Sequence, residues 1–190
     1  MLRLRTPTKP AWTETVLRDL DAFLIDHASC ERKASATAMA LVAHYPDRIE
    51  LVRAMIDLAL EELEHFRQTH EIMTTRGLVL GPLTRDDYVR GILQSLRDGS
   101  AEYFLDRLLV AGIVEARGCE RFGLVAEALP PGPLKVFYEG ITRSEARHHG
   151  LFVRLARTYF DESAVARRIE ELLDVEATII ESLSIRPALH

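Results

Sequence analysis

Residues 58–66 read Leu58-Ala-Leu-Glu-Glu-Leu-Glu-His-Phe66, and this stretch decides the fold. Leu51 and Met55 precede it at helical spacing, so Glu62 and His65 fall on the side of a helix where apolar residues are expected. Burying a carboxylate that has no compensating charge costs several kcal/mol. We therefore expect a cation beside Glu62.

The chain has 190 residues, and we expect it to form one domain, residues 1–190. Its apolar content of 47% is that of a globular protein, and it has no apolar run of the roughly 18 residues that a membrane helix needs. The N-terminal residues show no apolar stretch of the signal-peptide type, and two cysteines do not make a disulfide framework. These features predict a cytoplasmic protein that does not act at a membrane.

The formal net charge of −5 argues against a general nucleic-acid binder, because such proteins are usually basic. Of the 24 basic residues, however, three are Lys and 21 are Arg, the residue best suited to bidentate phosphate contacts. Solvated surface charge is the simpler interpretation of these arginines, and phosphate binding is the alternative.

Apolar residues recur at helical spacing along most of the chain, and no segment alternates as a strand would. A short helix is expected near the capping pattern of Thr84-Arg-Asp-Asp87, and Asp47 with Glu50 is expected to cap the second long helix. Two helix pairs joined by one long connection are typical of a ferritin-like four-helix bundle. The predicted fold is therefore all-α, a ferritin-like bundle with a long crossover and an additional C-terminal helix. The expected helices are 13–44, 47–76, 100–129, 133–159 and 163–183.

The Glu-x-x-His pattern of Glu62 and His65 occurs a second time, as Glu145 and His148, again on an apolar stripe. Each pair follows another inward-facing glutamate by a similar distance, 31 residues in the first half (62 − 31) and 30 in the second (145 − 115). The chain therefore contains two copies of one unit. The predicted metal ligands are Glu31, Glu62, His65, Glu115, Glu145 and His148.

Four carboxylates and two imidazoles in a bundle core are the ligand set of a pair of metal ions bridged by carboxylates. Such ligands suit Fe or Mn, and the absence of thiolate ligands argues against structural zinc. Two divalent ions would also offset the charge of four buried glutamates. A single Glu-x-x-His pair is more often a surface pair, but two copies at matching spacing favour the metal site.

Two further residues leave alternatives open. Glu120 competes with Glu115, because Cys-Glu-Arg occurs at both 30–32 and 119–121, although Glu120 lies about 140° away from Glu115 around a helix. His27, one turn before Glu31, is either a core histidine or a partner that holds a ligand carboxylate. The remaining acids and histidines near the pattern are expected at the surface or beside the ligands: Glu64, His70, Glu71 and His149.

The residues around these ligands resemble those of the MiaE family, the tRNA hydroxylases that act on 2-methylthio-isopentenyladenosine. The similarity runs from near the start of the chain to about Tyr159, with Val114 where Ile or Leu is expected. The stretches that carry it are Asp26-His-Ala-Ser-Cys-Glu-Arg-Lys-Ala34, Glu62-Leu-Glu-His-Phe66 with Arg76-Gly77, Ala111-Gly-Ile-Val-Glu-Ala-Arg-Gly-Cys-Glu-Arg-Phe122 and Ser144-Glu-Ala-Arg-His148.

This resemblance implies a monooxygenase with two iron ions, which uses O₂ and electrons from an external reductase or electron-transfer protein. Its substrate would be tRNA, hydroxylated on the isopentenyl group of the adenosine next to the anticodon, and the six residues given above would bind the iron. Two other functions remain open: a di-iron hydroxylase of a small lipophilic substrate, similar to demethoxyubiquinone hydroxylase, and ferritin-like iron handling without catalysis.

Arginine and lysine side chains would have to contact the tRNA phosphates around the site. The candidates are Arg3, Arg5, Lys9, Arg76, Arg85, Arg90, Arg143 and Arg147.

Overall fold

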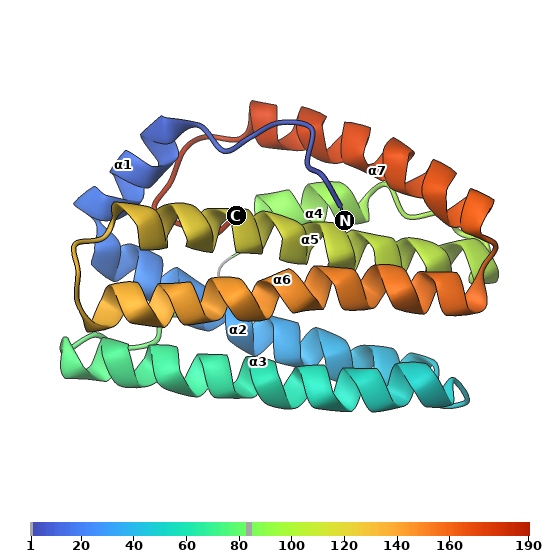
Figure 1. The fold of residues 1–190 in the computed structure, drawn as a ribbon, viewed down its shortest axis with the longest axis horizontal. Coiled ribbons are helices and arrows are strands. Elements are labelled where there is room, and N and C mark those ends of the chain that lie inside the picture. The colour runs from blue at the N-terminus through green and yellow to red at the C-terminus, as the bar shows by residue number, and fades with distance from the viewer. Residues whose placement is uncertain (1, 83–84) are drawn as a thin grey trace. The chain divides into compact units, whose positions relative to one another are not determined.

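The structure is a computed structural model that describes residues 2–82 and 85–190. Every regular element in the described ranges is a helix, which confirms the all-α prediction (Figure 1). The chain divides into two compact units. The α2/α3 unit comprises Glu14–Arg85 and Arg186–Leu189, and the α5/α6 unit comprises the residues up to Thr13, Asp86–Ile185 and His190. No helix in the described ranges has the length and hydropathy required to cross a membrane.

The first predicted helix is broken near its start. Helix α1 spans Pro10–Arg18 and α2 spans Leu20–His44, with Asp19 between them. The Asp19 side chain accepts a hydrogen bond from the Ala22 amide and caps α2. The expectation of one continuous helix was wrong because the apolar period continues through this point, and an aspartate can take the cap position without interrupting that period.

Helix α3 spans Ile49–Thr75 and packs antiparallel to α2 (Figure 1). Its N-cap residue is Arg48, whose side chain makes no capping hydrogen bond, so the cap predicted at Asp47 was wrong. At the other end Gly77 has a φ of 75°, and the amides of Gly77 and Leu78 donate to the carbonyls of Thr74 and Met73. This is the Schellman arrangement, and the prediction that Gly77 stops the helix is confirmed.

In the α5/α6 unit, α5 spans Ser100–Ala128 and α6 spans Pro133–Tyr159, close to the predicted ranges. Pro133 occupies the start of α6, where its missing amide proton costs nothing. Lys135 Nζ donates to the Ala126 and Glu127 carbonyls at distances of 2.5 and 3.3 Å. It thus satisfies carbonyls that the end of α5 leaves without helical partners.

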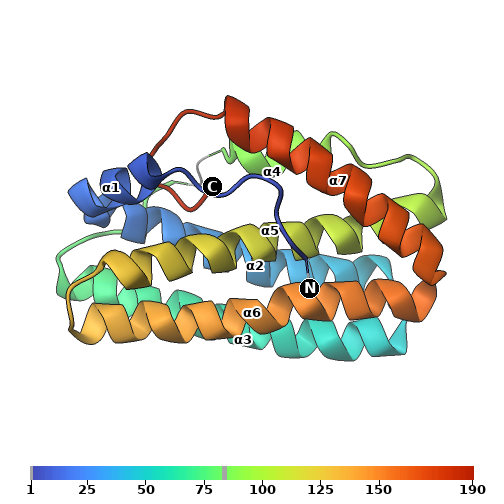
Figure 2. The same ribbon diagram turned by 45° about the horizontal axis from the view of Figure 1, so that its top comes forward.

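The short crossover helix α4 spans Asp87–Leu93, and the C-terminal helix α7 spans Glu162–Ser182, at an angle to α5 and α6 (Figure 2). Asp86 caps α4 by accepting from the Val89 amide. The short helix is therefore present, whereas Thr84, the first residue of the predicted capping pattern, lies outside the described residues.

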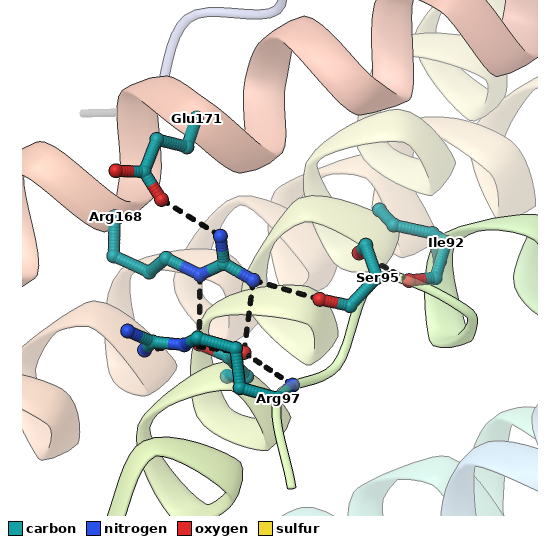
Figure 3. Close-up of polar contacts among 6 residues, drawn as sticks. Ile92, Ser95, Arg97, Arg168 and Glu171 are labelled. Carbon is teal, nitrogen blue, oxygen red and sulfur yellow. Dashed lines mark hydrogen bonds and ion pairs between the residues drawn. The ribbon is translucent and has the colours of Figure 1, made fainter.

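A buried carboxylate ties α7 to α5 and to the loop after α4. Asp106 on α5 is fully buried and accepts hydrogen bonds from Arg97 and from Arg168 of α7. Figure 3 shows the Arg168 guanidinium between Glu171 and the Ser95 carbonyl, to which it also donates. Through these contacts Arg168 links the additional C-terminal helix to α5 and to the loop after α4.

Candidate metal centre

Three of the predicted ligands lie together in the α2/α3 unit. Glu31 comes from α2, and Glu62 and His65 come from consecutive turns of α3; all three side chains are buried. His65 Nδ1 lies 3.3 Å from Glu62 Oε2 and 3.8 Å from Glu31 Oε2. One ligand atom from each residue fits within a span of 4.8 Å, which is the separation expected for donors to one metal ion.

A fourth side chain, His27, contacts the Glu31 oxygen that does not face His65. His27 is fully buried, and its Nε2 lies 2.6 Å from Glu31 Oε1. The two residues are one helical turn apart, so α2 itself fixes their approach. Of the two interpretations offered for His27, the structure favours the partner that holds Glu31. The other oxygen of Glu31 faces His65.

The pKa values of Glu31 and His65 indicate that a positive charge is stabilised in this cluster. Burial alone would raise the pKa of Glu31, but hydrogen bonds with His27 and His65 outweigh it and lower that pKa. Burial lowers the pKa of His65, whereas its contacts with Glu31 and Glu62 raise it, with a net result of about 9. Without metal, a protonated imidazole therefore offsets part of the negative charge of the two carboxylates. A divalent metal ion bound to neutral His65 would supply a larger positive charge at the same place.

The α5/α6 unit holds the second set of three. Glu115 comes from α5, and Glu145 and His148 come from α6. Glu145 and His148 are buried, Glu115 is half-buried, and His148 Nδ1 lies 3.4 Å from Glu145 Oε2. One ligand atom from each of the three again fits within 4.8 Å. Each unit thus brings one glutamate from its first long helix against a Glu-x-x-His pair on its second.

The two sets differ in the residue that lies one helical turn before Glu31 or Glu115. The residue four positions before Glu31 is His27, whereas the residue four positions before Glu115 is Ala111. The α5/α6 set therefore has no histidine at the corresponding place on its helix. If both sets bind metal, the carboxylate of Glu31 is oriented by its own helix, and that of Glu115 is not oriented in this way.

Glu115 and Glu120, the two candidates on α5, have different surroundings. The Thr8 amide and hydroxyl donate to the Glu120 carboxylate at 3.0 and 2.8 Å, and Arg117 donates to it as well. Glu120 therefore fastens the N-terminal segment to α5. Glu115 is the α5 glutamate that lies with Glu145 and His148.

The other acids and histidines near the motif take different places. Glu64 and Glu71 both form exposed ion pairs with Arg67, which agrees with the surface interpretation. His149 is buried, and burial is the main cause of its lowered pKa. It therefore lies inside the protein and not at the surface. His70 is half-buried.

Sequence reasoning missed a second group of buried charges in the α5/α6 unit. Arg117 and Glu176 are both fully inaccessible and form a 2.7 Å ion pair, and the Tyr88 hydroxyl donates to the same carboxylate. Arg117 also donates to the Thr6 carbonyl. Arg117 falls on the apolar side of α5, which was the available signal, but its partner lies 59 residues further along the chain.

Comparison with known proteins identifies relatives over nearly the whole chain. Residues 2–190 match the family model described as tRNA-(MS[2]IO[6]A)-hydroxylase (MiaE). A Pseudomonas putida protein named tRNA 2-(methylsulfanyl)-N(6)-isopentenyladenosine(37) hydroxylase is 38% identical over 179 residues, covering 94% of this chain and 87% of that protein. A Salmonella typhimurium protein of the same name is 29% identical over 226 residues, covering 93% and 83%.

A solved structure shares the fold. It is named protein 43 with aldehyde deformylating oxygenase activity, from Synechococcus, and superposes with a TM-score of 0.93 at 36% identity, covering 98% of this chain and 94% of that one. The ferritin-like fold class predicted from the sequence is confirmed. The family match, the two curated relatives and the doubled ligand pattern agree, and the chain belongs to the MiaE family.

Proposed function

We propose that this protein is an O₂-dependent monooxygenase that hydroxylates the isopentenyl group of 2-methylthio-isopentenyladenosine in tRNA, next to the anticodon. The observation that carries the proposal is the doubled set of ligands in a chain of this family. In each unit, one glutamate meets a Glu-x-x-His pair from the neighbouring antiparallel helix. An enzyme fits this family better than an iron-storage protein does, because both curated relatives are named as hydroxylases.

The donor set fits two iron ions. Glu31, Glu62 and His65 would hold one half of the centre, and the corresponding residues of the α5/α6 unit, Glu115, Glu145 and His148, would hold the other. Carboxylate and imidazole donors suit Fe or Mn, and the raised pKa of His65 marks a place where a positive charge is stabilised. With iron bound, the centre would supply O₂ activation and the hydroxylation of an unactivated C–H bond, with electrons from an external donor.

The chain's own residues would set the conditions for this chemistry. His27 holds one oxygen of Glu31, so that the other oxygen is oriented toward the metal side. Fully buried Leu24 and Met55 lie on the same helix stripes as the ligands and keep water from the α2/α3 set. In metal-free protein the raised pKa of His65 favours its protonated form, which offsets part of the charge of Glu31 and Glu62, and His65 would release that proton when metal binds.

The proposed partners follow from the reaction. The substrate is tRNA, which places the enzyme in the cytoplasm, and a separate reductase or electron-transfer protein is required. Sequence-independent contacts with tRNA would come from arginines that bind phosphates, since A-form RNA is recognised mainly by its shape and backbone.

Nucleoside analysis of tRNA tests the proposal directly. Total tRNA from a strain that lacks the gene should contain the unhydroxylated 2-methylthio-isopentenyladenosine and none of its hydroxylated form. Complementation with the wild-type gene should restore the hydroxylated nucleoside, and complementation with a Glu62→Ala variant should not. Persistence of the hydroxylated nucleoside in the deletion strain would show that another enzyme makes it.

A second candidate comes from the Synechococcus structure, whose name gives it aldehyde deformylating oxygenase activity. At 36% identity this likeness favours a related di-iron reaction on a small lipophilic molecule as the alternative. The two can be separated by salt dependence. Binding of tRNA should weaken steeply with salt, by a log–log slope of roughly 0.7–0.9 per phosphate contact, whereas binding of a neutral aldehyde should not.

A further inference from the structure

The outward side of α6 carries only positive charge along most of its length. From Gly140 to Tyr159 the sequence contains a single acid, Glu145, and that residue is buried among the ligands. The basic residues in the same stretch, apart from the two histidines, are all exposed arginines. They are Arg143, Arg147, Arg154 and Arg157.

These arginines form one row. At about 100° per residue they lie within an arc of roughly 80° around the helix, and Glu145 and His148 lie about 140–200° away, on the opposite side. The distance from Arg143 to Arg154 along the axis is about 16 Å, at 1.5 Å per residue. The same helix thus presents metal ligands on one side and a line of guanidinium groups on the other, one helix diameter apart.

Two glycines lie beside this row, and the fold does not require them. A Cβ atom at Gly150 would meet only Arg154 Nη1, at 3.3 Å, and one at Gly140 would meet only Arg143 Nη2, at 4.0 Å. Glycine within a helix is unfavourable relative to alanine, so its presence where alanine has room calls for another reason. The absence of a side chain at these two positions leaves the helix surface lower beside the guanidinium groups, and a bulky backbone would have room there.

The contacts of Arg143 and Arg154 distinguish them from three of the other basic candidates. Arg5 is paired with Glu170 and Asp174, Arg76 with Asp21, and Arg90 with Asp87. Within the described residues, no carboxylate pairs with Arg143 or Arg154. Arg147 donates to the Arg143 carbonyl and to Ser144 Oγ of its own helix.

Arg157, by contrast, forms an ion pair with Glu162, so we leave it out of the phosphate contacts proposed below.

Helix α3, which carries the other Glu-x-x-His pair, provides an internal comparison. The two helices align with an offset of 83 residues (145 − 62 and 148 − 65), so Arg143, Arg147 and Arg154 correspond to Leu60, Glu64 and Glu71. Leu60 is 63% exposed and Leu63 is 52% exposed. The outward side of α3 thus carries Leu60 and two glutamates that pair with Arg67, and it lacks the row of arginines found on α6. The charge on α6 is thus not a general property of the ligand helices.

We propose that Arg143, Arg147 and Arg154 bind consecutive phosphates of the tRNA substrate, with Gly140 and Gly150 allowing the ribose–phosphate backbone to approach the helix. This inference rests on the proposed function and assigns the RNA-binding surface within it. Guanidinium groups bind phosphate oxygens bidentately, and such contacts position a nucleic acid without reading its bases.

The test is a titration of prenylated tRNA, isolated from a strain that lacks the gene, into the iron-loaded enzyme at several salt concentrations. The row variant is the triple substitution Arg143→Gln, Arg147→Gln and Arg154→Gln. The affinity of this variant should fall about tenfold or more near 0.1 M salt, and the log–log salt slope should become less steep by about two to three. Replacing the same three residues with Lys should restore most of the slope, because the charge is kept.

The matched control removes three exposed arginines from around α3: Arg48→Gln, Arg53→Gln and Arg67→Gln. Both triple variants change the net charge equally, from −5 to −8 (−5 − 3). The control should bind tRNA within about twofold of the wild type, because its substitutions lie outside the proposed phosphate contacts. Circular dichroism and iron content should match the wild type in both variants.

Wild-type affinity and slope in the row variant would overturn the assignment, and so would an equal loss in both triple variants. Failure of the proposed function is recognised separately, because the wild-type enzyme would then not hydroxylate the prenylated tRNA at all. If the wild type hydroxylates it and the row variant binds normally, only the assignment of the surface fails.

Discussion

His27 Nε2 lies 2.6 Å from Glu31 Oε1 inside helix α2, and neither side chain reaches solvent to a significant extent. This contact leaves the second oxygen of Glu31 directed toward His65. If Glu31 is a metal ligand, His27 would fix the orientation of its carboxylate before a metal ion binds. The α5/α6 unit has Ala111 at the corresponding position and must orient Glu115 differently.

The first prediction concerns this contact. His27→Ala should lower iron affinity or hydroxylation activity about 10–100-fold, the range typical of residues that orient metal ligands. Iron per chain and turnover of prenylated tRNA are the measurements. His44→Ala is the control, because His44 lies on the same helix, is exposed and hydrogen-bonds the Ala40 carbonyl, far from the predicted ligands in sequence. Equal activity in both variants would show that His27 is only a core residue.

The second prediction separates Glu115 from Glu120. Glu115→Ala should lose iron while the metal-free protein unfolds at the wild-type urea concentration or above it, since a carboxylate leaves a charged cluster. Glu120→Ala should keep its iron but lose about 1–3 kcal/mol of stability, because Thr8 and buried Arg117 lose an acceptor. Iron analysis measures the iron content per chain, and urea unfolding of metal-free protein measures the stability. The reverse pattern would move the ligand to Glu120.

The sequence predicts most of the fold because its signals are local. The bounds of α6 follow from Pro130-Pro131-Gly132-Pro133 at one end, and the end of α3 follows from Gly77. The break between α1 and α2 at Asp19 cannot be predicted from such a local signal. The apolar period runs through Asp19, and a capping aspartate does not interrupt that period.

The residues of the candidate site also fall into two groups, those that the sequence predicts and those that only the folded chain shows. The predicted ligands can be identified in the sequence because each interrupts an apolar stripe at a repeated spacing, and His27 can be identified because its partner Glu31 is one turn away. The Arg117–Glu176 pair cannot be identified in this way, because two buried charges 59 residues apart find each other only in the folded chain. The arginine row on α6 can be recognised only once the structure shows which side of that helix is exposed and that Arg5, Arg76 and Arg90 already pair with carboxylates.

The third prediction is a pH dependence of stability. Burial would raise the pKa of Asp106, but hydrogen bonds from Arg97 and Arg168 outweigh it and lower the pKa below its ordinary value. The unfolded chain therefore takes up the proton first as the pH falls. The stabilisation is present above about pH 4, the unfolded pKa, and is lost as the pH drops toward the lower folded value.

Asp106→Asn should thus cost about 3 kcal/mol at pH 7 and flatten the fall of unfolding free energy below pH 4. Urea unfolding between pH 7 and pH 3 measures both effects. Asp98→Asn, in the exposed loop nearby, should leave the profile unchanged. An Asp106→Asn variant with the wild-type slope below pH 4 would show that this carboxyl does not carry the acid sensitivity.

The last prediction is that one substitution raises the stability of the protein and weakens its binding of tRNA. Gly150→Ala removes a helix-interior glycine, and the added Cβ meets only the flexible end of Arg154, at 3.3 Å. The free energy of unfolding should therefore rise by about 0.5–1 kcal/mol. The same methyl group displaces the Arg154 guanidinium and raises the surface beneath the proposed phosphate path, so the affinity for prenylated tRNA should fall. Gly123→Ala on α5 is the control, because its Cβ would make an ordinary 3.6 Å contact with Thr142. That variant should gain stability and keep its affinity for tRNA. If Gly150→Ala also keeps its affinity, the glycine has no part in RNA binding and the path must lie elsewhere on the protein.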